Sequence, residues 1–386
     1  MKLLDRYILR SFFEPFLISF FAFIAIWFII DLSDNITNFL DAGASFSQVS
    51  SYYLTQLPPT VLLSLPIGLL LALLFSLSRM SRTNEIISML TAGRSVFRVI
   101  LPLLVVGVAL TGVCLWLNWA LAPVAESVKK SGLKQIKKGR QPGEVQAVQG
   151  HLFRDRLHNR TWYVKKFRPG QPDMEQVHIT QQDEAGKITR KWYAAHATYD
   201  AANASWVLSD GIIVDFTAEG DIAATDNFLK STRTVTTWDE TPWRIASSEI
   251  SPQSLSVPEL REYLSTNSDF PALSLAPYRT NLADRFALPF SCLVVVLVAA
   301  PFGIVYNRRG VLGGVAWAVF FYVIMVMTDH LFVALGKGNR LDPWIAPWIS
   351  DVAVGIIGLL MLWLRSTNRD IASLFAKRRV IPQAPV

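Results

Sequence analysis

The sequence predicts an α-helical membrane protein with six transmembrane helices and one inserted all-β, jelly-roll-like domain. Three observations predict this fold class. Of the 386 residues, 51% are hydrophobic and only 17% are charged, whereas soluble domains carry about a quarter charged residues. The apolar residues are gathered in long blocks, and residues 54–78, 99–125 and 286–307 contain no charged side chain. A polar segment with strand-like patterns separates the third block from the fourth, so an ordinary soluble enzyme is excluded.

Six segments are long and apolar enough to cross about 30 Å of hydrocarbon as helices. We predict these spans at residues 12–32, 54–78, 98–122, 281–305, 311–334 and 344–364. The first span is rich in Phe and Ile and ends at Asp31 rather than at small residues. It is therefore expected to stay in the protein as an anchor rather than to be cleaved as a signal peptide.

The distribution of Lys and Arg predicts the orientation of these spans, because short cytoplasmic loops carry an excess of both residues. Fourteen fall on one side: Lys2, Arg6, Arg10, Arg79, Arg82, Arg94, Arg98, Arg308, Arg309, Arg365, Arg369, Lys377, Arg378 and Arg379. The short loops of the other side hold only Lys337 and Arg340. A basic cluster at residues 129–140 opposes this assignment, but long translocated segments are largely exempt from the rule. Both termini are therefore expected in the cytoplasm, with the polar segment across the membrane.

The polar segment is expected to form β structure, because short runs rich in β-branched and aromatic residues alternate with turn residues. Strands are predicted at residues 161–167, 176–182, 191–199, 205–208, 212–217 and 231–238, and a short returning helix at Val257–Leu264. This divides the chain into three parts. Residues 1–124 hold three spans and a cytoplasmic helix at about 82–93, residues 125–278 the β domain, and residues 279–386 three spans and a tail.

The sequence contains none of three common nucleotide-binding, metal-binding and hydrolase motifs. There is no phosphate-binding G-x-x-x-x-G-K-[ST] loop, no H-E-x-x-H and no G-x-S-x-G, and the five histidines lack metal-ligand spacing. We therefore expect no catalytic residues, no metal, no bound cofactor and no nucleic-acid partner. The few ionisable residues noted inside the spans lie near span ends: Glu14, Asp329, His330 and Asp351. Because ion-coupled transporters keep charges near the membrane centre, any energy for transport is expected from another protein.

The loop between the second and third spans carries the clearest functional pattern. Ser81, Thr83 or Asn84 is suited to cap a short helix, and Gly93 to end it. Within that helix Ile86, Met89 and Leu90 share one face, with Arg82 and Glu85 beside it. Such a helix could dock into a groove on a soluble partner, or it could simply close the hairpin at the membrane surface.

The stretch from Leu65-Pro66 through Leu69, Ala72 and Leu73 to Glu85-Ile86-x-x-Met89-x-Ala92-Gly93 resembles the signature of the LptF/LptG lipopolysaccharide export permeases. Leu4-Asp5-Arg6-Tyr7-Ile8, Trp238 and Leu255-Ser256 are more similar to the LptG side of this family. The resemblance implies inner-membrane permease subunits in which the loop helix couples to a cytoplasmic ABC ATPase dimer that binds the ATP. The residues it implies for coupling are Arg82, Glu85, Ile86, Met89 and Gly93.

The same resemblance implies the other partners: a paralogous LptF-like six-span permease, LptC/LptA-like periplasmic jelly-roll bridge proteins, and lipopolysaccharide as substrate. Members of the LptG side often carry lysines at the outer end of the first span, but here residues 31–41 contain three Asp and no Lys or Arg. Arg279, Arg285, Lys129, Lys130 and Lys134 are the alternative candidates for lipid phosphates, although ordinary snorkelling explains each one as well. Gly310-x-x-x-Gly314 would permit close helix packing.

Two other functions stay open at this point. A lipoprotein-releasing permease of the mechanotransmitting kind usually has four spans and a domain after the first span, whereas here the domain follows the third. A non-transporting, membrane-anchored assembly or ligand-binding protein would not need six spans or a loop helix able to seat an ATPase.

Overall fold

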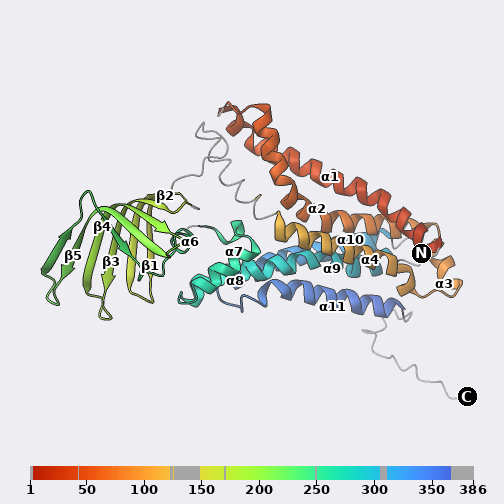
Figure 1. Ribbon diagram of the computed structural model, residues 1–386. Helices are drawn as coiled ribbons and strands as arrows, with labels where there is room; N and C mark the ends of the chain where they lie inside the picture. The colour runs from red at the N-terminus through yellow and green to blue at the C-terminus, as the bar shows by residue number, and fades with distance from the viewer. Residues whose placement is uncertain are drawn as a thin grey trace, which may run out of the picture. The chain divides into compact units, whose positions relative to one another are not determined.

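The computed structural model describes residues 3–41, 43–121, 125, 148–168, 171–247, 250–304 and 311–366, except for the side chains of residues 120 and 311–314. The chain forms two compact units. One is helical and consists of Met1–Leu40, Val49–Glu126 and Ala276–Val386, and the other consists of Asp41–Gln48 and Ser127–Leu275 and contains the β-sheet. Figure 1 shows both units along the chain.

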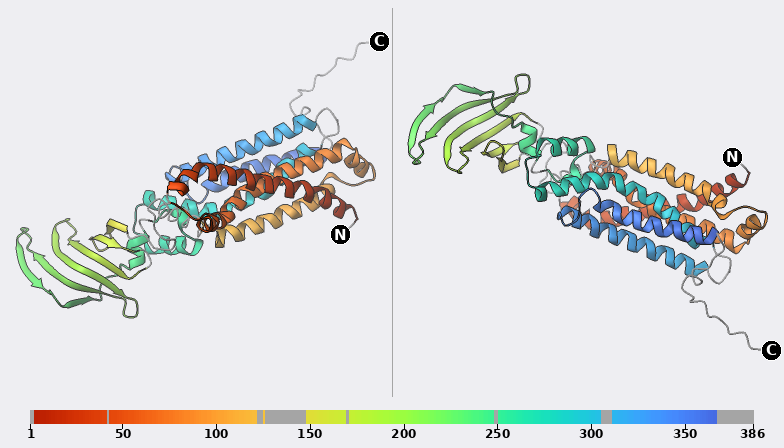
Figure 2. Two further views of the ribbon diagram at one scale, coloured as in Figure 1. Left: turned by 90° about the horizontal axis from the view of Figure 1, so that it is seen from above. Right: turned by 90° about the horizontal axis from the view of Figure 1, so that it is seen from below.

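The helical unit confirms the six predicted spans, since six helices of the described chain are long and apolar enough to cross a membrane. They run lengthwise along one another (Figures 1 and 2). Their bounds are α1 (Leu3–Asp41), α2 (Phe46–Arg82), α4 (Val96–Ala120), α8 (Ala272–Ala287) with α9 (Ser291–Gly303), α10 (Val311–Lys337) and α11 (Ala346–Ser366). A seven-residue helix, α3 (Glu85–Thr91), lies between α2 and α4.

Three spans differ from their predicted bounds. The helices α1 and α2 have 39 and 37 residues, or more than 50 Å each at about 1.5 Å per residue, so both are longer than a bilayer core. The fourth span begins at Ala272 rather than at residue 281. It is interrupted by a 3₁₀ turn, η2 (Leu288–Phe290), because Pro289 has no N–H to continue the α-helical hydrogen bonding.

The second span forms the centre of the helical unit. Within the most apolar stretch of α2, 72% of residues are buried, and Leu69, Leu73 and Leu77 are fully buried. In the corresponding apolar stretches of α1 and of the fifth span, α10, only 6% and 17% of residues are buried. These two helices therefore leave most of their apolar surface uncovered by this chain.

The β unit is one antiparallel sheet of seven strands, in the order β1-β2-β3-β4-β5-β6, with β7 pairing to another part of β5 (Figure 1). The strands are β1 (Val148–Asp155), β2 (Arg160–Phe167), β3 (Asp173–Gln182), β4 (Ile188–Asp200), β5 (Ser205–Phe216), β6 (Ile222–Asn227) and β7 (Thr232–Val235). Each strand from β1 to β6 follows its neighbour through a short turn. Gly186 and Gly220 take positive φ at two of these turns, which favours glycine.

One face of the sheet carries the apolar core of this unit. Trp162 and Trp206 are fully buried, with ring centroids 4.9 Å apart, and Trp238 packs edge-on to Trp162 at 5.1 Å. After the sheet come α6 (Pro242–Ser247), a 3₁₀ turn η1 (Pro252–Ser254) and α7 (Val257–Thr266). The predicted helix at Val257–Leu264 is thus present, and Ser256 and Glu259 start it with a reciprocal capping box.

The strand predictions are correct for β2, β3, β4 and β7 to within a few residues, and wrong in two ways. Residues 205–208 and 212–217 belong to the single strand β5, because Asp210 adopts a positive φ of 53° that interrupts the alternation without ending the strand. The strands β1 and β6 were not predicted. All six residues of β6 are exposed, so it lacks the alternating apolar pattern that marks a half-buried strand.

Candidate functional site

The loop between α2 and α4 folds as two turns around α3. Arg82 is the last residue of α2, so the predicted helix at 82–93 begins three residues too early. Asn84 takes a positive φ of 61° before the helix starts at Glu85. At the other end Gly93 has a φ of 82°, and the N–H groups of Gly93 and Arg94 donate to the carbonyls of Leu90 and Met89. This left-handed glycine ends the helix as predicted.

The Glu85 carboxylate connects α3 to the first span. One of its oxygens accepts a hydrogen bond from the Tyr7 hydroxyl at 2.8 Å, and the other accepts one from the Thr83 hydroxyl at 2.8 Å. Tyr7 lies in the second turn of α1. The contact therefore joins two segments that are 78 residues apart in the sequence.

The apolar face of α3 is turned toward the rest of the helical unit. Ile86 is 2% exposed and belongs to the apolar core, while Met89 and Leu90 are half-buried against the same core. Arg82, Ser88 and Gly93 are exposed. The polar side of α3 is therefore exposed, whereas Ile86 anchors the helix to its own chain.

Two further contacts brace the same end of the helical unit. Arg98 at the start of α4 pairs with Asp5 of α1 at 3.3 Å. The buried Ser81 hydroxyl donates to the Gly303 carbonyl at 2.9 Å, which joins the end of α2 to the end of α9. Asp5, Tyr7 and Ser81 occur in motifs noted from the sequence, but neither they nor Gly303 are predicted to make these contacts. No local pattern reveals them, because their partners lie 78 to 222 residues away.

The two arginines expected to meet lipid phosphates differ in their surroundings. The Arg285 guanidinium donates to the Asn118 side-chain carbonyl at 3.0 Å, and the Asn118 amide donates back to the Arg285 backbone carbonyl at 2.9 Å. Arg285 is therefore engaged between α8 and α4. Arg279 is half-buried on α8, and the structure shows no ion pair or hydrogen bond from its side chain to any residue it describes. Lys129, Lys130, Lys134 and Gly310 lie outside the described residues, and Gly314 lies in α10 without a described environment.

A third acidic residue lies in the spans of the second half of the chain. Asp284 falls within α8, as it does within the predicted span 281–305, and it interacts electrostatically with Asp329 of α10 and Asp351 of α11. Asp351 lies near the start of α11 and is 7% exposed within the chain. Among the described residues, no group of three or more potential metal ligands occurs.

Comparison with known proteins identifies the family. The family model described as "Lipopolysaccharide export system permease LptF/LptG" matches residues 6–364. Two similar proteins are the "Lipopolysaccharide export system permease protein LptG" of Escherichia coli K12 and that of Escherichia coli O6:H1. Each is 23% identical over 374 residues, covering 94% of this chain and 98% of the relative. The match includes both groups of spans, the β domain and the α3 loop, and the chain belongs to the LptF/LptG family of lipopolysaccharide export permeases.

Proposed function

We propose that this chain is the LptG-type permease subunit of an ABC exporter that extracts lipopolysaccharide, or a related glycolipid, from the inner membrane. Family membership supports the export of lipopolysaccharide by a multi-pass inner-membrane permease. The observation that carries the finer proposal is the Glu85–Tyr7 hydrogen bond, which ties the short helix α3 to the first span. A chain with no nucleotide-binding loop has to receive the energy of ATP from another subunit.

In this proposal a cytoplasmic ATPase dimer binds the polar side of α3. Movement of α3 on ATP binding passes through Glu85 and Tyr7 to α1, and through the buried Ile86 to the centre of the helical unit. The helix α1 exposes most of its apolar surface, which suits it to line a cavity for acyl chains together with a paralogous permease. The β domain lies in the periplasm and passes the lipid to bridge proteins of similar fold.

Glu85 gives the direct test. In the assembled complex, Glu85→Ala and Glu85→Lys should reduce ATP-dependent lipid release at least tenfold while membrane insertion is unchanged, because the link between α3 and α1 is lost. Tyr7→Phe removes only the hydroxyl donor and should produce a smaller loss in the same direction. Glu219→Ala and Glu219→Lys, which make the same changes at an exposed turn of the β domain, are the matched controls. Normal lipid release by Glu85→Ala would refute the coupling role.

The two alternative functions receive less support. The family match extends over residues 6–364, and the six spans and the place of the β domain fit an export permease. A mechanotransmitting lipoprotein permease or a non-transporting assembly protein would not be expected to match this family over its whole length. Co-purification separates these functions, since the proposal requires an ATPase and a second six-span subunit.

A further inference from the structure

A row of paired outward residues crosses the β-sheet. In a regular strand, successive side chains point to opposite faces. Here two consecutive residues in each of five neighbouring strands lie on the face away from the apolar core. They are Gln149-Gly150 in β1, Lys165-Lys166 in β2, Glu175-Gln176 in β3, Ala195-His196 in β4 and Ser209-Asp210 in β5. We call this row the crease.

Because two consecutive side chains point outward, the alternation of inward and outward residues reverses at the crease, and the core residues on either side of it show this reversal. In β2, Val164 and Phe167 are both buried in the core although they are three residues apart. In β3 the same is true of Met174 and Val177. In a regular strand, residues three apart would face opposite sides. The strand pairing nevertheless keeps its register, with Val164 opposite Val177 and Phe167 opposite Met174, so every strand accommodates the reversal at the same level.

The backbone explains how the crease forms. Gly150, Gln176 and Asp210, in the alternate strands β1, β3 and β5, have φ values of 71°, 52° and 53°. Positive φ is uncommon for residues other than glycine, and in strands such backbone irregularities redirect side chains. Strained backbone of this kind persists only where the surrounding structure holds it, and it gathers at binding sites.

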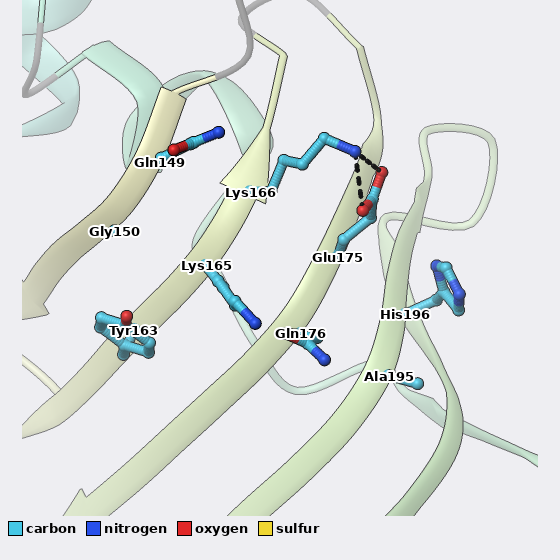
Figure 3. A pocket seen from close by; sticks show the side chains of 9 residues that line it. All are labelled: Gln149, Gly150, Tyr163, Lys165, Lys166, Glu175, Gln176, Ala195 and His196. Carbon is cyan, nitrogen blue, oxygen red and sulfur yellow. Dashed lines mark hydrogen bonds and ion pairs between the residues drawn. The ribbon is translucent and has the colours of Figure 1, made fainter.

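The crease opens into a pocket on the outward face of the sheet (Figure 3). The pocket has a volume of about 660 Å³ and is lined by the crease residues of β1 to β4, together with Tyr163. Its lining includes the side-chain amides of Gln149 and Gln176, the His196 imidazole and the Tyr163 hydroxyl. This set of donors and acceptors suits a ligand that carries several hydroxyl groups.

The charges in the pocket leave one cation without a partner. The Lys166 ammonium donates to both oxygens of Glu175, at 2.7 and 2.9 Å. This hydrogen bond lowers the pKa of Glu175, so its carboxyl group is ionised at neutral pH. Lys165 is exposed, and within the described part of the chain its ammonium has no hydrogen bond or ion pair. Two lysines against one glutamate therefore give the pocket a net positive charge that favours an anionic group.

Aromatic rings continue the outward face beside the pocket. The rings of Tyr163, His178 and Tyr193 follow one another across β2, β3 and β4, with centroids 5.6 and 4.9 Å apart. Both tyrosines are 37% exposed. Half-exposed tyrosine offers an apolar ring together with a polar hydroxyl, and sugar rings present the matching pair of C–H faces and hydroxyls.

We propose that the crease is a binding site for an anionic saccharide, a phosphorylated or carboxylated sugar whose charge lies against Lys165 and whose ring packs on Tyr163. The proposal needs no transport step and does not rest on the coupling role of α3. Such a sugar has two sources, the saccharide part of a glycolipid or a free sugar phosphate, and both carry the same recognised chemistry.

Saturation-transfer difference NMR on the full chain in detergent micelles tests the site without ATPase or transport. The probes are glucose 6-phosphate, glucose, inorganic phosphate and a deacylated, phosphorylated lipopolysaccharide oligosaccharide. Glucose 6-phosphate should bind at least fivefold more tightly than either glucose or inorganic phosphate. Tighter binding of the oligosaccharide would assign the site to the glycolipid, and tighter binding of glucose 6-phosphate would assign it to a free sugar. Equal binding of glucose and glucose 6-phosphate would overturn the proposal, as would equal binding of inorganic phosphate.

Two variants with opposite expected effects on affinity distinguish a loss of the binding site from damage to the fold. Lys165→Glu should weaken binding of the phosphorylated probes about tenfold, the size of one charge-assisted hydrogen bond. Glu175→Gln replaces the carboxylate with a neutral amide and removes the ion pair with Lys166, which leaves a second ammonium group available to the ligand. It should therefore tighten binding severalfold, a gain that damage to the fold would not produce. Arg156→Glu, at an exposed position in the β1–β2 turn, makes the same charge change outside the pocket and should leave binding unchanged. Unchanged affinity in both pocket variants would also overturn the proposal.

Discussion

Arg279 and Arg285 illustrate how similar residues on one helix acquire different roles. Both lie on α8, and both are expected from the sequence to meet lipid phosphates. Arg285 exchanges two hydrogen bonds with Asn118 and so braces α8 against α4. Arg279 keeps its charge available, because the described residues give it no side-chain partner. The two positions should therefore respond differently to neutralisation.

Arg279→Gln should reduce crosslinking of the chain to lipopolysaccharide while leaving thermal stability unchanged. Arg285→Gln should lower thermal stability instead, because it removes the donor to Asn118. Photo-crosslinking in native membranes and the unfolding midpoint of the purified chain measure the two effects. If neutralising Arg279, Arg285 and the basic residues of 129–140 together leaves lipid crosslinking unchanged, phosphate recognition belongs to the partner permease.

A buried polar network stabilises the β domain. Asp155, which is fully buried, accepts hydrogen bonds from His158 at 2.6 Å and from Arg244 at 3.4 Å. Arg160 contacts both oxygens of the buried Glu240 at 2.7 and 2.9 Å. Burial by itself would raise the pKa of Asp155, but the His158 hydrogen bond and the Arg244 charge outweigh it and lower that pKa. The ionised form of Asp155 therefore favours the folded state.

Asp155→Asn should destabilise the β domain by about 3 kcal/mol at pH 7, because it leaves buried donors with a weaker partner. The difference from the wild type should shrink as the pH falls below about 4, since the wild-type carboxyl then takes up a proton and loses the same contribution. Hydrogen exchange of peptides from β1 and β2 measures the effect. Asp226→Asn breaks an exposed pair with Arg233 and should change stability by less than about 1 kcal/mol. A pH-independent difference would contradict this assignment.

At the scale of elements, close approach between helices depends on a few glycines. A Cβ atom at Gly107 of α4 would lie 2.8 Å from Val296 of α9, and one at Gly303 would lie 2.6 Å from Leu77 of α2. Both distances are shorter than Cβ atoms tolerate, so the helices meet only because these positions lack a side chain. Gly112, on the same helix as Gly107, has no atom within 4 Å of its virtual Cβ.

Gly107→Ala should lower the free energy of unfolding by about 1–3 kcal/mol, because the added methyl group forces α4 away from α9. Gly112→Ala adds the same methyl group to the same helix in open space and should be neutral. The unfolding midpoints of the two variants in one detergent give the comparison. Equal midpoints would show that the α4–α9 contact adjusts without cost.

The whole molecule leaves two of its six spans largely uncovered. The helices α1 and α10 bury only 6% and 17% of their most apolar stretches, while α2 buries 72%. In a membrane, lipid can cover such surfaces without energetic cost, so their exposure alone does not require a partner. Within an LptF/LptG permease, we expect α1 to face both the lipid cargo and the second permease.

A photoreactive residue at Ile18, which is 66% exposed on α1, should crosslink to lipopolysaccharide or to a second six-span subunit in native membranes. The same probe at Leu359, which is 52% exposed on α11, should capture only bulk phospholipid. Mass spectrometry of the adducts identifies each product and the lipid that the complex carries. Identical adducts at the two positions would argue against a cargo-facing role for α1.

The sequence alone predicts the architecture because its strongest signals are local. Hydrophobic length predicts six spans, and β-branched runs between turn residues predict most of the strands. Gly93 predicts the end of α3, because a left-handed turn favours glycine. The Leu65–Gly93 stretch carries the family resemblance for the same reason, since its residues lie in one continuous segment.

Only the tertiary structure reveals what depends on distant residues. Glu85 pairs with Tyr7, which is 78 residues away, and Ser81 pairs with Gly303, which is 222 residues away. Arg285 differs from Arg279 because it is hydrogen-bonded to the distant Asn118. The crease cannot be recognised from one strand alone, because its two consecutive outward residues form a row only when five strands align them in register. Periodicity along a chain specifies which elements form and which face they bury, while the contacts between elements decide which polar groups remain available to bind.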